Sequence, residues 1–349
     1  MKSHYINTLL ALGMALGAQA SAGTLLMNEA SGNTNLAEVK GSDYETIVVQ
    51  SDSTIGKVTS DPAVNFINVQ AKLTVNSDLD ANQISLNQYG KDCELRVEGN
   101  LTAGNVTIAQ GEKVVVSGTT TINGSVGLSQ KSSLQTGKLV INGSGAPYSS
   151  INNSTILADE IEVNHTFSLM GGTISAADGE GTFTVGEGGR ITQQGTSVLL
   201  DTVVEGGVLT MYKGSFDGIT MEDGMLDVRG NVTTGALTLN GGELSINSGV
   251  VIDLGGQDLV LSDNVAVTVN VSSLDDALTQ NYVLFTNMGK VAGSPLEVIF
   301  QTYDGTESQK ASLTYHADGS VTVAAVPEPA TATLSLLALA GLCARRRRK

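Results

Sequence analysis

Carboxylate side chains are the residues of this sequence with the clearest potential for chemistry. Paired carboxylates hydrolyse glycosidic bonds, one as the acid and the other as the base or nucleophile. The acidic groups with suitable spacing are Glu160 with Glu162; Glu222, Asp223 and Asp227 beside Arg229; and Asp253, Asp258 and Asp263. A groove that collected three of them, or that added Arg229 or Arg190, would indicate a polysaccharide-degrading enzyme. Because outward positions of strands in an acidic chain carry carboxylates for solubility alone, we predict no catalytic residues.

Metal and nucleophile chemistry have weaker support. Asp178-Gly-Glu180 and Glu222-Asp223-Gly could offer oxygen ligands to calcium, but neither belongs to a multi-ligand loop, so we predict no metal site. His165 shares a face with Ile161, Val163 and Phe167 by alternation, which indicates a packed or coil-edge histidine. His316 lies at a hairpin turn, where exposure is expected. Cys93 has no histidine nearby and is interpreted as a buried packing residue.

Short catalytic motifs are absent from the sequence. It contains no GxSxG, HExxH, CxxC or phosphate-binding glycine loop. The 349 residues include 19 bases and 35 acids, for a net charge of −16. This charge argues against a nucleic-acid surface, because phosphate binding needs clustered Lys and Arg. We therefore expect a protein that is not an enzyme and that has no cofactor.

The elements that would position these residues are short strands. Runs such as Leu95-Arg96-Val97 and Leu244-Ser245-Ile246 alternate apolar and polar residues, which is the period of a strand with one buried face. The segment Val97–Ile108 matches Val228–Leu239 at six of twelve positions. The apolar phase recurs locally after 19 residues from Val97 to Val116, and after 20 from Ile108 to Leu128. A period near 20 is typical of solenoid coils.

The predicted fold is therefore all-β, a parallel β-helix or β-solenoid with coils of about 20 residues. Abundant Gly (41 residues), five Pro and no Trp suit stacked coils with a narrow interior. About 225 residues would make roughly eleven coils and a rod about 50 Å long. The alternative is a β-sandwich, or two in tandem, which also has short strands at regular spacing.

Changes of texture divide the chain. Residues 23–45 are less periodic and are predicted to cap the N-terminal end, and residues 46–280 form the solenoid repeats. From residue 281 the strands become longer and more aromatic, and Asp318-Gly319 signals a hairpin turn. Residues 281–326 are therefore the expected C-terminal β cap, which would hide the last open strand edge.

Residues 1–22 have the pattern of a secretory signal peptide. Lys2 is followed by an apolar run, and small residues place cleavage after Ala20 or Ala22. The run is shorter than the ~20 residues of a spanning helix. We expect export through the secretion translocon.

The C-terminus has a second three-part signal at residues 327–349. The motif Pro327-Glu328-Pro329 precedes an apolar stretch, Ala330 to Ala344, and the chain ends in Arg345, Arg346, Arg347, Arg348 and Lys349. Fifteen helical residues reach about 22 Å, short of a ~30 Å hydrocarbon core, so the segment suits transient retention in the inner membrane. The terminal charges would stay in the cytoplasm and stop transfer.

This ending resembles the PEP-CTERM sorting signal of Gram-negative bacteria that make exopolysaccharide. The resemblance covers about the last two dozen residues. It implies recognition and processing by a membrane enzyme called exosortase, with delivery to the cell surface, the outer envelope or the extracellular matrix. It implies nothing about residues 23–326.

Without the two ends, residues 23–326 keep 13 bases and 34 acids, a charge of about −21, and only Cys93. We expect an exported structural or adhesive β-solenoid of the cell surface or exopolysaccharide, with extracellular polysaccharide as a candidate partner. The alternative is a polysaccharide-degrading β-helix enzyme, a lyase or a glycoside hydrolase. An autotransporter-like passenger is disfavoured because nothing resembling a membrane barrel follows the repeats.

Overall fold

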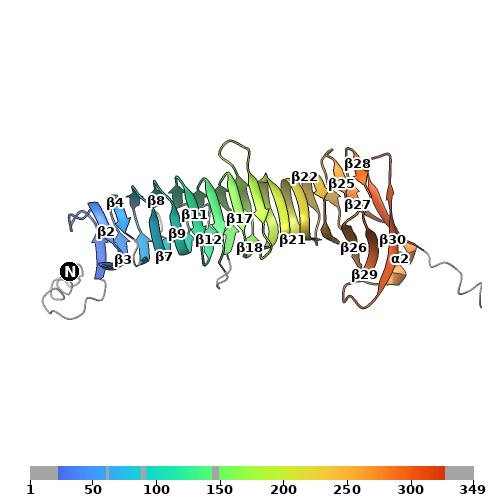
Figure 1. Cartoon of the computed structure of the whole chain (residues 1–349), viewed down its shortest axis with the longest axis horizontal. Coiled ribbons are helices and arrows are strands. Elements are labelled where there is room, and N and C mark those ends of the chain that lie inside the picture. The colour runs from blue at the N-terminus through green and yellow to red at the C-terminus, as the bar shows by residue number, and fades with distance from the viewer. Residues whose placement is uncertain (1–22, 60–62, 88–91, 144–148, 327–349) are drawn as a thin grey trace, which may run out of the picture.

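Short strands stack into a parallel β-solenoid, as the alternation of apolar and polar residues predicts. The computed structural model describes residues 23–59, 63–87, 92–143 and 149–326. Strands make up 65% of the structure and helix about 2%, and coils of about 20 residues form about 12 turns. Figure 1 shows the coils stacked along the long axis of the molecule, from the blue N-terminal coils to the orange C-terminal ones. The β-solenoid is thereby confirmed, and the β-sandwich alternative is wrong.

The register between coils follows the sequence period. Val97 pairs with Val116, and Ile108 pairs with Leu128, each in a parallel ladder. These are the two pairs that the 19- and 20-residue recurrence predicts, and their side chains are buried. Register is strongly specified here because a slip of one residue would turn every apolar side chain of a strand outward.

Parallel pairing arranges the strands in three columns that run along the solenoid. The first column contains β1 (Gly23–Met27), β3 (Tyr44–Val49), β5 (Val64–Val69), β7 (Leu79–Leu86), β9 (Leu101–Ile108), β12 (Val126–Ser129), β15 (Ser149–Asn152), β18 (Thr166–Leu169), β21 (Arg190–Val228), β23 (Gly242–Asn247), β26 (Val265–Val271) and β29 (Glu297–Thr302). The second column contains β2 (Asn35–Lys40), β4 (Ser53–Thr59), β6 (Lys72–Val75), β8 (Glu94–Val97), β10 (Lys113–Val116), β13 (Ser133–Gln135), β16 (Ser154–Leu157), β19 (Gly172–Ser175), β22 (Val232–Leu239), β24 (Ile252–Asp253) and β27 (Tyr282–Thr286).

The third column contains β11 (Thr119–Ile122), β14 (Lys138–Ile141), β17 (Glu160–Val163), β20 (Thr182–Val185), β25 (Leu259–Leu261) and β28 (Val291–Gly293). Longer strands bend around corners and contribute to more than one column. The clearest case is β21, which pairs with β18, β19 and β20 in turn and so passes through all three columns.

Apolar side chains from the three columns fill the interior. In β8, for example, Leu95 and Val97 are buried while Arg96 between them lies outward. Cys93 is also buried in this core. Full burial of one Val, Leu or Ile side chain contributes about 1.5–3 kcal/mol. Because each coil has only a few such residues, stacking on its neighbours supplies the rest of the core.

Corners between strands are held by Asn and Asp side chains. In each case a side-chain oxygen of one coil accepts a hydrogen bond from a backbone N–H of the next coil. The pairs are Asp52 with Lys72, Asp78 with Asn100, Asn100 with Thr119, Asn105 with Ser125, Asn231 with Val251, and Asp258 with Lys290. Several acids of this chain are therefore structural.

The C-terminal end changes from parallel to antiparallel pairing. Strands β27, β28 and β29 still continue the three parallel columns. Antiparallel pairing begins with β30 (Ser308–Tyr315) and β31 (Val321–Ala325), which pair with β29, with each other and with β27. A six-residue helix, α2 (Leu274–Thr279), lies between β26 and β27 and is capped by Ser273. Parallel coils thus extend beyond the boundary at 280 that the change of texture suggested, because longer strands still fit the columns.

The N-terminal end also differs from the expected boundary. β1 and β2 already pair in parallel with β3 and β4, so residues 23–45 join the columns. The alternation of Leu25 and Met27, both buried, continues the pattern of the later coils. Both predicted targeting segments, residues 1–22 and 327–349, lie outside the described residues. Within the described part of the chain, no helix combines the length and apolar character needed to cross a membrane.

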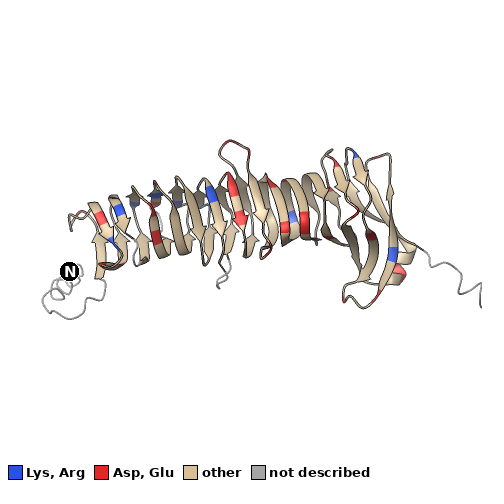
Figure 2. Ribbon diagram, in the orientation of Figure 1, with Lys and Arg blue, Asp and Glu red and all other residues tan. Residues whose placement is uncertain are grey.

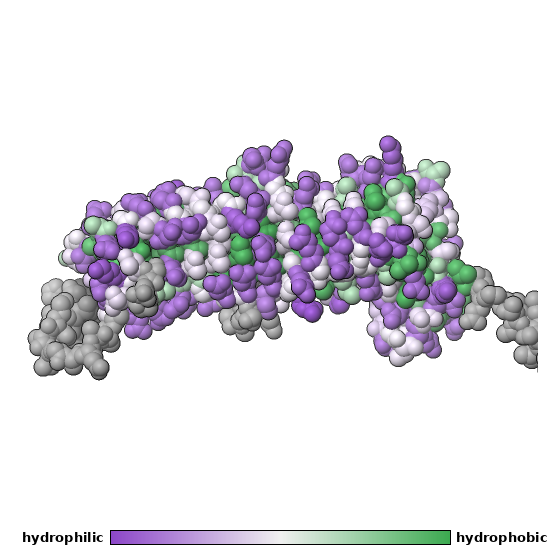
Figure 3. All heavy atoms as spheres, in the orientation of Figure 1, coloured by the Kyte–Doolittle hydropathy of each residue, from purple (hydrophilic) through white to green (hydrophobic). Residues whose placement is uncertain are grey.

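Exposed apolar side chains gather at the C-terminal end. Of the nine large hydrophobic side chains exposed among the described residues, six follow residue 274. The face shown in Figure 3 is otherwise mainly hydrophilic, with narrow apolar strips between polar rows. Charged residues are scattered along the whole length (Figure 2). Exposed apolar and polar side chains are therefore most closely mixed on the coils at the C-terminal end of the rod.

Candidate functional site

Two adjacent rows of outward side chains form a polar groove on the first column near the cap. Successive coils contribute Asp227 and Arg229, then Ser245 and Asn247, then Asn270. The groove has a volume of about 360 Å³ and is lined by Met225, Asp227, Arg229, Ser245, Asn247, Asn270 and Tyr303. We call these residues the C-terminal groove. Alternation in β21, β23 and β26 turns them outward, because their neighbours Leu226, Leu244 and Val269 are buried.

An Arg–Asp pair anchors one end of this groove. Arg229 Nε donates to Asp227 Oδ2 across 2.7 Å, and Asp227 is 8% exposed. Arg229 Nη1 also donates to the hydroxyl of Tyr212 at 3.2 Å, and its guanidinium lies 5.8 Å from the centre of that ring. Partial burial lowers the pKa of Arg229, but the bonds to Asp227 and Tyr212 outweigh it, and the pKa is raised. The guanidinium is thus held in a fixed orientation.

Amide side chains form the floor farther along. Asn270 Nδ2 donates to Ser245 Oγ at 2.9 Å and lies 3.4 Å from Asn247 Oδ1. Tyr303, which follows β29, closes the far end, and its backbone N–H donates to Val271 O. Asp227 is the one carboxylate among the lining residues. Hydrolysis of a glycosidic bond by the usual route needs two carboxylates, so this arrangement suits binding better than cleavage.

A second depression adjoins the groove at Tyr303. It has a volume of about 510 Å³ and includes Ser272, Thr302, Asp304 and Glu307. Asp304 Oδ1 accepts bonds from Thr302 Oγ1 and from both the Oγ1 and the N–H of Thr306, and these bonds lower its pKa to about 2. Asp304 therefore holds a turn, and its bonded oxygen is already occupied.

Glu160 and Glu162 meet on the third column, as their i and i+2 spacing requires. Lys138 Nζ on the preceding strand lies 3.2 Å from Glu160 and 3.6 Å from Glu162. The hydrogen bond to Glu160 is the main cause of the raised pKa of Lys138. The cluster borders a depression of about 480 Å³ that also includes Glu205 and Thr184. These are exposed ion pairs, which water and salt screen, and they form an ordinary solvated surface network.

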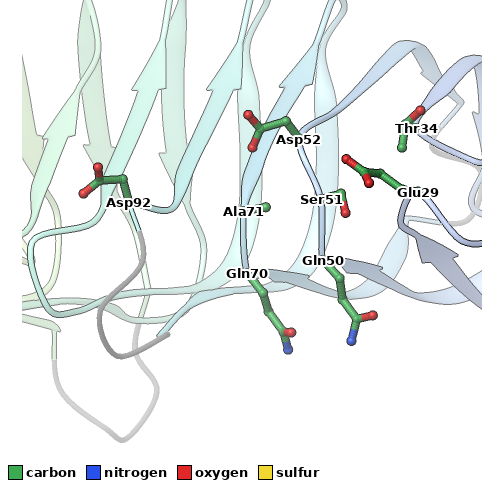
Figure 4. Close-up of a pocket in the computed structure, with 8 residues that line it drawn as sticks. All are labelled: Glu29, Thr34, Gln50, Ser51, Asp52, Gln70, Ala71 and Asp92. Atoms are coloured by element: carbon green, nitrogen blue, oxygen red, sulfur yellow. The ribbon is translucent and has the colours of Figure 1, made fainter. Parts of the chain in front are cut away.

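A fourth depression lies on the N-terminal coils. It has a volume of about 520 Å³ and is lined by Glu29, Thr34, Gln50, Ser51, Asp52, Gln70, Ala71 and Asp92. Figure 4 shows Gln50 and Gln70 extending in the same direction from successive coils. Asp52 is used to accept the N–H of Lys72. Its lining includes three carboxylates and no base, so it is an open acidic surface.

The other acidic groups do not come together. Glu222 accepts from Asn240 Nδ2, and Asp223 accepts from the N–H of Gly224, so neither joins Asp227 and Arg229. Asp253 accepts from Gly255 and Asn287, and Asp258 from Lys290, at different corners of one coil. Asp263 is exposed before β26. The sequence grouped these residues by proximity in the chain, but corners separate them in space.

The remaining candidates have structural surroundings. Asp178 accepts from the N–H of Glu180 within the loop between β19 and β20, and Arg190 is exposed at the start of β21. Among the residues that the structure describes, no three His, Cys, Asp or Glu side chains are placed to hold a metal ion.

The two described histidines lie at turns. His165 lies at the corner between β17 and β18, half-buried, and its Nδ1 accepts from the N–H of Thr166 at 2.7 Å. His316 is exposed, and its Nε2 lies 2.8 Å from Thr322 Oγ1.

Sequence reasoning missed most of the C-terminal groove. It singled out Asp227 and Arg229 but not Asn247, Asn270 or Tyr303. It also missed Tyr212 beside Arg229, and Lys138 in the other cluster. The signal that could have found them is the set of outward side chains, at positions i and i+2 of the strand in each coil. Aligning these positions between coils requires the length of each coil, and coil lengths vary from turn to turn.

Comparison with known protein families identifies the C-terminal end of the chain. A family model described as the PEP-CTERM protein-sorting motif matches residues 325–349. The C-terminus of this chain is therefore a PEP-CTERM sorting motif, as predicted, and marks an exported protein processed by exosortase-type machinery. No curated protein and no solved structure matches the chain.

Proposed function

We propose that this PEP-CTERM protein is a non-catalytic structural rod of the cell surface or of the exopolysaccharide matrix, with an adhesive role toward extracellular polysaccharide. The observation that carries the proposal is the order of its parts: about 12 stacked coils, the antiparallel strands β30 and β31, and then the sorting motif at residues 325–349. While such a rod is attached at one end, it holds the rest of its surface away from the envelope.

The route that we propose begins with residues 1–22 as a signal peptide, cleaved after Ala20 or Ala22. The translocon would deliver the body across the inner membrane, and the apolar segment Ala330 to Ala344 would retain it there transiently. Processing at the motif then frees the rod for the surface or the matrix.

The absence of catalysis is supported by how the described carboxylates are used. Glu160 and Glu162 share Lys138, Asp227 is paired with Arg229, and Asp253 and Asp258 hold corners. The competing hypothesis, a polysaccharide-degrading enzyme, can be tested with purified protein. If the purified protein releases reducing ends or unsaturated products from a panel of glycans, the structural role is wrong.

Cell fractionation tests the sorting and the surface location. Wild type, Glu328→Ala and the matched exposed control Glu180→Ala are expressed in the native host, with and without its exosortase. We expect wild type and the control at the surface without their Arg cluster, and Glu328→Ala retained in the membrane with an intact terminus. Equal surface display of all three with an intact terminus would overturn the proposal.

A further inference from the structure

We infer that the C-terminal groove is a binding site for an uncharged polysaccharide chain, which lies along the solenoid axis between Tyr212 and Tyr303. The inference rests on the proposed function, since it needs an exported protein in contact with glycans, and it adds the location of the site and the chemical class of the ligand.

The groove, extended by Tyr212 beside Arg229, forms a track for a linear polymer. Tyr212, which borders the groove, and Arg229, Asn247 and Asn270, which line it, come from successive coils, and Tyr303 follows the strand of the coil after them. Adjacent coils are about 4.8 Å apart, so the four steps span about 19 Å. A length of this size fits several linked sugar rings and exceeds a single sugar.

Aromatic rings lie at both ends of the track. Tyr303 is 59% exposed and Tyr212 is 39% exposed, and among the described residues before residue 274 Tyr212 is one of three exposed large hydrophobic side chains. Tyrosine presents a flat apolar face with a polar tip, which suits the alternating C–H and O–H surfaces of a sugar ring. Arg229 holds the Tyr212 ring, so this ring is oriented before a ligand arrives. For Tyr303, the hydrogen bond to Val271 fixes the position of the backbone.

Between the rings the groove offers hydrogen-bonding groups that the protein does not use. Within the described residues, Asp227 Oδ1, the Nδ2 of Asn247 and the Oδ1 of Asn270 take part in no protein hydrogen bond. They include both donors and acceptors, as neutral hydroxyl groups require. The bonds that the same side chains do make fix their orientation, which reduces the entropy cost of binding.

The charge of the surroundings selects against acidic polymers. The one base in the groove, Arg229, is already paired with Asp227, and Asp304 and Glu307 lie in the adjoining depression. The body as a whole, with 13 bases and 34 acids between residues 23 and 326, would repel uronate or sulfated chains. An uncharged polysaccharide has no such penalty.

Affinity electrophoresis tests the site. The purified protein is run in native gels that contain hydroxyethylcellulose, or the neutral fraction of the host's own exopolysaccharide, or alginate, all with a chelator to prevent bridging by divalent cations. We expect retardation by at least one of the neutral polymers and none by alginate. Tyr303→Ala should weaken the retardation about ten-fold, since it removes a stacking ring. The matched control is Tyr315→Ala, an exposed tyrosine on β30 that does not line the groove.

Circular dichroism of each variant distinguishes loss of binding from loss of folding, and Asn247→Ala provides a second variant that changes no ring. Three results would overturn the inference: no retardation by either neutral polymer, retardation by alginate alone, or equal weakening by Tyr303→Ala and Tyr315→Ala. Because sorting is scored separately by fractionation, failure of the groove and failure of the surface location give different results.

Discussion

Asp78 Oδ1 accepts a hydrogen bond from the backbone nitrogen of Asn100 across 2.7 Å and thereby joins a corner of one coil to a corner of the next. Asn100 repeats the arrangement, since its own Oδ1 accepts from the N–H of Thr119 at 2.9 Å. Strand ladders stop at corners, and backbone groups there need other partners. Side chains of Asp and Asn thus extend the inter-coil bonding across the turns, which explains part of the acidic composition.

The first prediction concerns this corner. Asn100→Ala removes the acceptor of the Thr119 N–H and is expected to lower the free energy of unfolding by about 1 kcal/mol. Urea denaturation followed by circular dichroism measures the change. The matched control is Asn123→Ala, because Asn123 is exposed and its side chain makes no hydrogen bond within the described residues. An equal effect of the two substitutions would show that the corner bond contributes nothing.

The second prediction compares two neighbours on β20. Phe183 is fully buried and stacks between Ile161 and Thr202 of adjacent coils, whereas Thr184 lies outward. Phe183→Ala leaves a cavity that flanking coils cannot fill, with an expected loss of about 3–5 kcal/mol. Thr184→Ala should change stability by less than about 0.5 kcal/mol. Thermal and urea midpoints of both variants measure this; a small loss for Phe183→Ala would mean that the coils collapse around the gap.

The sequence predicted the fold well because the decisive signal is local. Period-two alternation places Val97 and Val116, or Ile108 and Leu128, on the same inner face one coil apart. The match between Val97–Ile108 and Val228–Leu239, in contrast, does not mark equivalent positions in two coils. Val97–Ile108 ends in β9, which bends from the third column to the first, whereas Val228–Leu239 ends in β22, which bends from the second to the third. The matching residues form a bend between two strands, and the same bend occurs at two different corners of the coil.

The groove was beyond sequence reasoning because its residues depend on coil lengths. Tyr212 and Arg229 are 17 residues apart, but Asn247 and Asn270 are 23 apart. Helix α2 then lengthens the last coil before Tyr303. Without these lengths, the outward residues of successive coils cannot be aligned, although the polar pattern within each strand is visible.

The third prediction concerns acid. The hydrogen bonds from Thr302 and Thr306 lower the pKa of Asp304 to about 2, below the value of about 4 for an unfolded chain. Because the folded pKa is the lower one, the turn gains stability that is fully present above about pH 4 and is lost as the pH falls through about 2. Carboxyl NMR titration should give a midpoint near pH 2 for Asp304. Thr306→Val should raise this midpoint; an unchanged value would exclude the hydroxyl as a cause.

The fourth prediction concerns the spacing between coils. Gly172 pairs with Ser154 of the preceding coil at a φ of 102°, and a Cβ at this position would collide with the Ser154 carbonyl. Gly111 also has a positive φ, 83°, but a Cβ there would meet nothing within 4 Å. Gly111→Ala should therefore cost only the backbone strain, about 1–2 kcal/mol. Gly172→Ala must also displace the Ser154 backbone, which the hydrogen bonds between coils hold in place. Its loss of folding free energy should therefore exceed that of Gly111→Ala by ~1–3 kcal/mol. Urea midpoints of the two variants test the order, and equal losses would show that neighbouring coils can separate to admit a methyl group.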